Sequence, residues 1–220
     1  MFKKLLTLTL VVAMVATMLT GCGSNSAEKN GSNTEAGGEA NKTLSIATPA
    51  DAKSLDPHLT NDTPSANIMI NMYENLMTLD EDGNPVGQLA EKWEKIDELS
   101  YKFYLKQGVL FHNGEEMKAS DVKFSLLRAM NIEGSSVSHV VGDIDPEGFE
   151  IIDDYTIVIK LKRPFSVFLS YLTHVGGGSI LCEKAVTEAG ENYGENPIGT
   201  GPYKYKSWAK GDRIVLERYG

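Results

Sequence analysis

The chain has 220 residues, of which 41% are hydrophobic and 23% charged, and its formal net charge is −9. This composition is ordinary for a soluble globular protein, and it excludes collagen, a disulfide-stapled miniprotein and a fully disordered chain. The acidic balance also argues against nucleic acid as a partner, because a non-specific nucleic-acid binder needs a basic surface that releases counterions.

The first 21 residues have the pattern of a secretion signal. Lys3 and Lys4 precede an uncharged apolar run over 5–19, which is about 22 Å of helix at 1.5 Å per residue. A bilayer core is roughly 30 Å thick, so the run is short for a permanent span. The sequence LTGC at 19–22 resembles a bacterial lipobox, whose cysteine accepts a diacylglyceryl group. We therefore expect lipidation of Cys22; the alternative is an ordinary signal peptide with an incidental cysteine.

Residues 23–42 form a polar stretch without any aromatic residue, Val, Ile or Leu. Such a stretch cannot bury enough apolar surface to offset its chain entropy. We expect a flexible tether with a reach of about 25 Å between the anchor and a domain over 43–220. With Cys22 lipidated, Cys182 has no disulfide partner, and its apolar surroundings predict a small buried side chain.

The first part of this domain gives four predicted elements. We expect a short strand over 43–48, a loop over 49–64, a helix over 68–79 and a turn over 80–85. The turn resembles the start of a calcium loop, but the glutamate that would complete such a loop is missing. The helix would bury one stripe, made of Met69, Met72, Tyr73, Leu76 and Met77.

The clearest local patterns follow between 101 and 130. Strict alternation of apolar and polar residues predicts a strand over 101–105. Asn113-Gly114 is a strong turn signal. An amphipathic helix is expected over 119–130, with Val122, Leu126 and Ala129 on its buried face.

The remaining residues predict two hairpins and two short helices. The first hairpin occupies 148–162 and turns at Asp153-Asp154, and the second pairs 203–208 with 213–218. Short helices are expected over 165–172 and 183–189. Mixed strands and helices with several hairpins indicate an α+β or mixed α/β class with some antiparallel sheet.

No residue pattern marks a catalytic or metal site. The sequence contains no P-loop, GxSxG, HExxH or CxxC motif. Its four histidines, His58, His112, His139 and His174, lie far apart and lack metal-ligand spacing. We therefore expect no cofactor, no metal and no enzymatic activity. A Ser–His–Asp triad stays open, because such triads have no fixed order along a chain.

A series of short motifs runs in order through residues 54–218. The motifs are SLDPH at 54–58, LAEKW at 89–93, YKFYL at 101–105, GVLFHNG at 108–114, ASDVKFS at 119–125, DYTI at 154–157, RPF at 163–165 and NPIGTGPY at 196–203. Together they resemble the family 5 extracellular solute-binding proteins, the dipeptide, oligopeptide and nickel receptors of ABC importers. The motifs over 89–125 resemble the family's signature block, and those over 196–218, with Trp208 and Gly211-Asp212, resemble its second conserved block. The resemblance covers nearly all of residues 43–220.

Most of these motif residues are expected to be scaffold. Gly199 and Gly201 would allow close backbone approach where the chain crosses between lobes or subdomains, and Trp93 and Phe111 would anchor the core. Lys118 departs from the family, which usually has Thr or Ser there as a helix cap. We expect a frayed helix start or a cap from elsewhere.

The resemblance implies a periplasmic-binding-protein-like fold of type II, a two-lobed clamp whose first lobe carries an inserted subdomain. Ligand would be trapped by hinge closure, without chemical change. Family chains are considerably longer, so we expect an N-terminal fragment with the second lobe missing. Candidate ligand contacts are Thr60, Asn61, Asp62 and Thr63 in the first loop and His174, Gly177 and Ser179 in the Gly-rich turn; each is alternatively a solvated loop residue.

The implied partners are a peptide, an ABC permease complex and the membrane, reached through the lipid anchor, with the protein itself a monomer. The same fold could instead take a nickel chelate, an oligosaccharide or another solute. The sequence also leaves open a surface enzyme or adhesin that shares only the tether, and an inactive truncated fragment.

Overall fold

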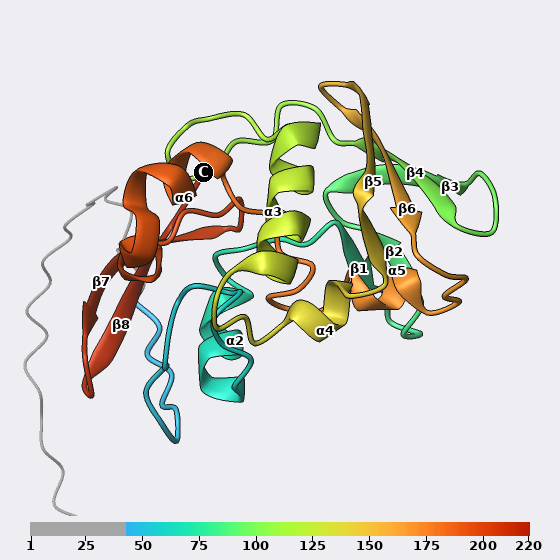
Figure 1. The fold of residues 1–220 in the computed structure, drawn as a ribbon. Coiled ribbons are helices and arrows are strands. Elements are labelled where there is room, and N and C mark those ends of the chain that lie inside the picture. Colours follow the sequence, from blue (N-terminus) through green and yellow to red (C-terminus); the bar gives the residue numbers. More distant parts are fainter. Residues whose placement is uncertain (1–42) are drawn as a thin grey trace, which may run out of the picture. The chain divides into compact units, whose positions relative to one another are not determined.

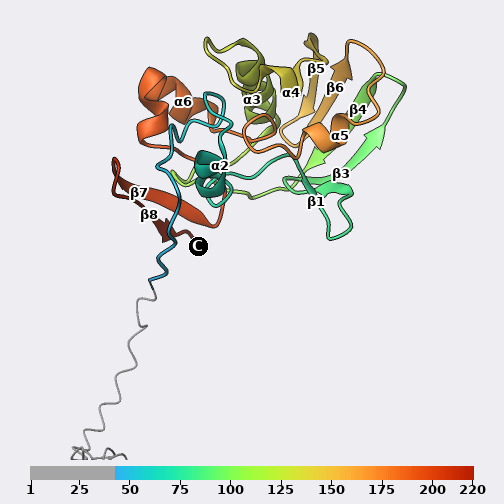
Figure 2. The same cartoon turned by 90° about the horizontal axis from the view of Figure 1, so that it is seen from below.

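The computed structural model describes residues 43–220, of which Ile46–Gly220 form one compact unit. The predicted signal segment, the lipobox with Cys22 and the tether lie outside the described residues. Figures 1 and 2 show a four-stranded sheet at one end of the unit, a two-stranded hairpin at the other, and helix α3 between them.

The four-stranded sheet is antiparallel throughout. Its order is β3 (Ala90–Lys95), β4 (Ser100–Leu105), β6 (Thr156–Leu161) and β5 (Ile144–Asp153). Tyr101, Phe103 and Leu105 are buried on one face of β4, so the predicted alternation is confirmed. Phe103 of β4 is paired with Ile157 of β6, and both side chains are fully buried in the larger of two hydrophobic clusters.

Helix α3 (Ala119–Asn131) supplies the other side of this cluster, as the 3–4 spacing predicts. The side chain of the lysine at 118 offers no acceptor, so other groups bond to the start of the helix. The carboxylate of Asp121 accepts the Lys118 N–H at 2.9 Å, and the Asp154 carbonyl oxygen accepts the Ala119 N–H at 2.8 Å. The Asp154 carbonyl is the predicted cap from elsewhere, whereas Asp121 belongs to the helix and forms half of a capping box.

A second hydrophobic cluster lies toward the other end of the unit. It joins α2 (Thr63–Met69), α6 (Glu183–Ala189), the 3-10 helix η1 (Gly190–Glu195) and the hairpin of β7 (Tyr203–Ala209) and β8 (Arg213–Arg218). Ile198 packs against both clusters and so connects them. The smaller elements are β1 (Met77–Leu79) paired with β2 (Pro85–Gly87), α4 (Ser138–Val141) and α5 (Phe168–Tyr171).

Two predicted elements are wrong. Residues 43–48 form no strand, and Leu44 and Ile46 are exposed, because no other strand of the described chain pairs with them. The predicted helix over 68–79 is replaced by α2, which ends at Met69, and by strand β1. Its apolar stripe is nevertheless buried throughout.

Tertiary hydrogen bonds explain why the helix stops early. The carbonyl oxygens of Asn71 and Met72 accept the N–H groups of Tyr203 and Gly201, at 3.0 and 2.9 Å, instead of continuing a helical ladder. Trp93 also departs from expectation: it lies on edge strand β3 and is 37% exposed, whereas Phe111 is fully buried as predicted.

Candidate functional site

A buried ion pair holds the first loop against α3. Arg128 of α3 donates from both terminal nitrogens to the carboxylate of Asp56, at 2.6 and 3.0 Å. Only 10% of the arginine side chain and 3% of the aspartate side chain are exposed. This two-bond geometry is the strong form of an arginine–carboxylate pair, so it fixes where the loop leaves the core.

His58 completes this buried group. Its Nδ1 accepts from Arg128 at 2.9 Å, so Nε2 carries the proton, and Nε2 is buried without a hydrogen-bond partner in the described residues. Burial, reinforced by the charge of Arg128, lowers the pKa of His58 to about 3. The imidazole is therefore neutral at physiological pH.

Two buried tyrosines connect this group to the chain near residue 200. The ring of Tyr193 faces the guanidinium of Arg128 at 5.7 Å, and its hydroxyl donates to the Ile198 carbonyl at 2.7 Å. The hydroxyl of Tyr73 lies 3.1 Å from the Leu55 carbonyl, to which it donates. Burial raises the pKa of both tyrosines, so both stay protonated.

The Gly-Thr-Gly segment packs as close to its neighbours as the sequence predicts. A Cβ on Gly199 would collide with the Met72 carbonyl oxygen, and one on Gly201 would lie 2.7 Å from that of Asn71. His112 is bonded to both glycines: its Nδ1 accepts the Gly199 N–H, and its Nε2 lies 2.9 Å from the Gly201 carbonyl. His112 thus has a structural role, because it fixes the Gly-Thr-Gly segment from both of its ring nitrogens.

In the first loop, two of the predicted ligand contacts, Thr60 and Asp62, bond to the protein itself. The buried hydroxyl of Thr60 donates to Asp62, and Asp62 caps α2 by accepting the Ser65 N–H at 3.1 Å. Asn61 and Thr63 are exposed, and the amide of Asn61 donates weakly to a neighbouring carbonyl at 3.4 Å. The loop therefore presents Asn61 and Thr63 outward.

In the Gly-rich turn, Gly177 and Ser179 are buried and His174 is half-buried. Ser179 donates to the side chain of Asn75 at 2.9 Å. A Cβ on Gly176 would collide with the Pro57 carbonyl, so the structure brings this turn and the first loop side by side. Ligand contact by these residues stays a prediction.

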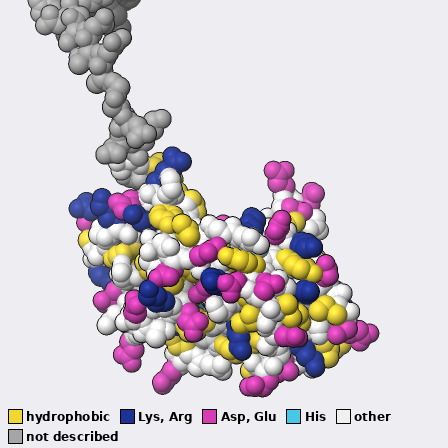
Figure 3. All heavy atoms as spheres, turned by 90° about the horizontal axis from the view of Figure 1, so that it is seen from above, with side chains coloured by type: hydrophobic (Ala, Val, Ile, Leu, Met, Phe, Trp, Pro, Cys, Tyr) yellow, Lys and Arg dark blue, Asp and Glu magenta, His cyan; other side chains and the backbone are white. Residues whose placement is uncertain are grey.

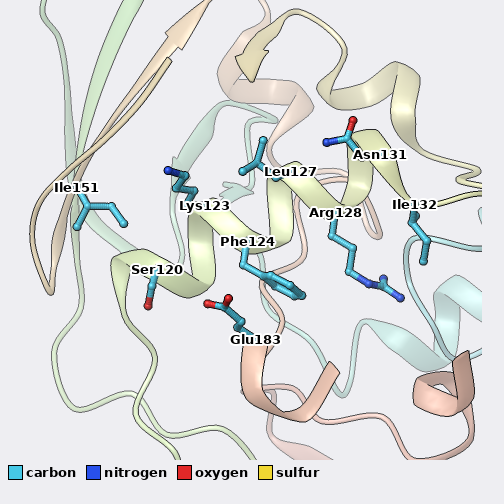
Figure 4. Close-up of a pocket in the computed structure, with 9 residues that line it drawn as sticks. All are labelled: Ser120, Lys123, Phe124, Leu127, Arg128, Asn131, Ile132, Ile151 and Glu183. Carbon is cyan, nitrogen blue, oxygen red and sulfur yellow. The ribbon is translucent and has the colours of Figure 1, made fainter. Parts of the chain in front are cut away.

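An open hollow of about 510 Å³ lies along α3 and was not predicted from the sequence (Figure 4). Its floor is the outward face of α3, and Ile151 of β5 and Glu183 of α6 stand at its sides. Arg128 lines the hollow and also holds Asp56, so one end of the hollow lies next to the first loop. A second apolar stripe on α3, Phe124 and Leu127, was the signal available in the sequence. The α3 residues of the floor are Ser120, Lys123, Phe124, Leu127, Arg128 and Asn131.

Residues 84–220 match the model of the family described as bacterial extracellular solute-binding proteins, family 5 Middle. The chain belongs to this family. The mixed α/β fold with antiparallel sheets is accordingly that of a family 5 solute-binding protein. Members of the family are extracytoplasmic proteins that bind solutes.

Among family 5 relatives, the glutathione-binding protein GsiB of Pectobacterium atrosepticum is 33% identical over 181 residues, which is 82% of this chain and 35% of the relative. Two solved structures resemble the fold. DppA from Helicobacter pylori with the peptide STSA is 29% identical with a TM-score of 0.67, covering 77% of this chain and 38% of that one. NikZ from Campylobacter jejuni with Ni(L-His) is 28% identical with a TM-score of 0.66, covering 76% and 34%.

The chain thus spans about a third of the length of the family 5 proteins that it matches. Within residues 43–220, no helix combines the length and the apolar character needed to cross a membrane.

Proposed function

We propose that this chain acts as the substrate-binding lipoprotein of an ABC importer, which captures peptides outside the cell and delivers them to the permease without chemical change. The match to the family 5 model over 84–220 carries this proposal. GsiB is a glutathione-binding protein and DppA was solved with a tetrapeptide, and both of these ligands are peptides. We take the protein to be a monomer that is anchored through lipidated Cys22.

Three features of the described residues support ligand capture. The first loop and the Gly-rich turn lie side by side, with Asn61 and Thr63 exposed. The buried Arg128–Asp56 pair makes the base of the first loop rigid, and rigid positioning reduces the entropy lost on binding. The hollow along α3 offers a concave, partly apolar surface, as small-molecule sites usually do.

Isothermal titration of the protein, produced as its gene encodes it, tests this function. A set of di- to pentapeptides should give saturable heats, and the absence of heat across the whole set would refute peptide binding. Mass spectrometry of ligand that co-purifies with the protein would identify the natural solute.

A metal chelate is the second candidate, because NikZ resembles the fold as closely as DppA does and was solved with Ni(L-His). Titration with nickel and L-histidine together, compared with L-histidine alone, separates this ligand from peptides. Binding of the chelate with silence toward every peptide would favour this candidate.

A further inference from the structure

The hollow along α3 is lined by two charged side chains that form no ion pair within residues 43–220. Lys123 lies on the α3 floor and Glu183 at the start of α6. Neither side chain takes part in any of the ion pairs of residues 43–220. Figure 4 shows Glu183 reaching toward Ser120 and Phe124, while Lys123 lies on the side of α3 that faces Ile151. One cation and one anion therefore flank the same hollow.

Apolar surface lies between and beside these charges. Phe124, Leu127 and Ile132 are half-buried, and Ile151 is 44% exposed. Phe124 already packs against the second hydrophobic cluster, so its ring is held in place. A ligand that covers this surface would gain about 25 cal/mol for each Å² of apolar area removed from water.

We propose that this hollow binds a short peptide with free termini, with the peptide carboxylate at Lys123, its ammonium group at Glu183 and an apolar side chain over Phe124 and Leu127. This inference rests on the proposed function and names a second binding surface beside the two loops. The charge pattern argues for it, because a zwitterion with an apolar centre complements one cation, one anion and an apolar floor. Because Lys123 and Glu183 lie on different sides of α3, the peptide crosses the helix.

Chemical-shift mapping of the isotope-labelled chain tests the proposal. The probe is Ala-Leu-Ala with free termini, used up to about 10 mM because half-exposed ion pairs contribute little each. We expect saturable shifts of backbone amides in α3 and at the start of α6. The N-acetylated and the C-amidated forms of the same tripeptide should each bind about fivefold more weakly. Free leucine, which has the same charges, distinguishes a peptide site from an amino-acid site.

Charge-neutral variants assign each terminus. Lys123→Gln should weaken the free and N-acetylated peptides about fivefold and leave the C-amidated peptide unchanged. Glu183→Gln should weaken the free and C-amidated peptides and leave the N-acetylated peptide unchanged. Lys106→Gln and Glu98→Gln are the matched controls, because both side chains are exposed, lie outside the hollow and form no ion pair in residues 43–220.

Several results would overturn the proposal. Shifts confined to residues 57–63 and 174–179 would place peptide binding in the loops and leave the proposed function intact. Equal affinity for free and blocked peptides, or equal effects of the variants and their controls, would refute the charge assignment. Tighter binding of leucine than of the tripeptide would show that the hollow is an amino-acid site and not a peptide site. If no probe shifts any resonance, the hollow is not a peptide site, and the calorimetric experiment decides the proposed function separately.

Discussion

At the scale of single residues, the group around Arg128 places a charged pair inside the protein, where a charge without a partner would strongly destabilise the fold. Within the described residues, the hydrogen bonds of the Arg128 guanidinium go to Asp56 and His58, which lie 72 and 70 positions away in the sequence. The motif SLDPH was recognisable in the sequence, but its partner was not, because nothing local pairs position 56 with position 128. The same holds for the unpaired charges of Lys123 and Glu183, which flank one hollow because α3 and α6 pack side by side.

Removing one partner of the buried Arg128–Asp56 pair should therefore lower the stability of the fold. Asp56→Ala leaves the Arg128 charge buried, and we expect a loss of about 3–5 kcal/mol in the free energy of unfolding. Urea denaturation measures this loss as a lower midpoint at unchanged slope. Asp143→Ala breaks the pair with Arg163, whose side chain is 69% exposed, and is the control, with a much smaller expected effect. Equal midpoints for the two variants would show that the buried pair has no special role.

His58 makes a pH prediction with a definite sign. The unfolded chain takes up a proton at this histidine below about pH 6.5, while the folded chain does so only near its lowered pKa of about 3. The unfolded state therefore binds more protons, and stability falls as the pH drops through this window, by about 1.4 kcal/mol per unit. Between pH 7 and 5 the native protein should lose about 2 kcal/mol more than His58→Gln does.

Comparing each protein with itself at the two pH values removes the effect of the substitution on packing. Chemical denaturation at pH 7 and pH 5 supplies the four free energies. An identical pH dependence in both proteins would mean that His58 is not a buried neutral group.

At the scale of helices and strands, prediction succeeded where the signal was local. Three elements could be predicted from their own residues alone. They are the strand with the alternation over 101–105, helix α3 with its amphipathic spacing, and the 203–218 hairpin with its turn residues. Prediction failed over 68–79, because Gly201 and Tyr203 take the carbonyl groups that a continuing helix would use. Residues 43–48 have strand composition but no partner strand in the described chain, and composition alone cannot supply one.

Asp121 joins two elements and provides a test at this scale. One carboxylate oxygen accepts the Lys118 N–H at the start of α3, and the other accepts the Glu183 N–H at the start of α6, at 2.9 and 3.0 Å. Asp121→Ala leaves both helix starts without this acceptor, so we expect a loss of about 1–3 kcal/mol in the free energy of unfolding. Hydrogen exchange should quicken at the first turns of both helices.

Asp82→Ala is the control for this variant, because its exposed side chain makes no hydrogen bond in the described residues. It should leave exchange in α3 and α6 unchanged. If Asp121→Ala quickens exchange in α3 alone, the link to α6 has no energetic role.

At the scale of the whole molecule, the proposed function needs a lipid anchor and a tether in addition to the described domain. Figure 3 shows acidic and basic side chains mixed over one face of the domain, with apolar side chains between them. This face gives no strong electrostatic attraction to an anionic lipid headgroup layer, and the chain as a whole has a net charge of −9, so the proposed membrane association would depend on the lipid. A tether with a reach of about 25 Å would hold the domain close enough to meet a permease while leaving it free to turn.

Cys22 is thus the residue on which localisation should depend. Two acyl chains suffice for stable anchoring, at about 0.8 kcal/mol per buried CH₂ group, whereas the uncharged run before Cys22 is short for a span. In detergent phase partitioning of cell extracts, the native protein should enter the detergent phase, and its mature N-terminal peptide should carry the mass of the lipid. Cys22→Ser should abolish that mass and move any processed protein to the aqueous phase. Cys182→Ser changes the buried cysteine of the domain and should leave partitioning unaltered; an N-terminal peptide of the native protein without lipid would refute the anchor.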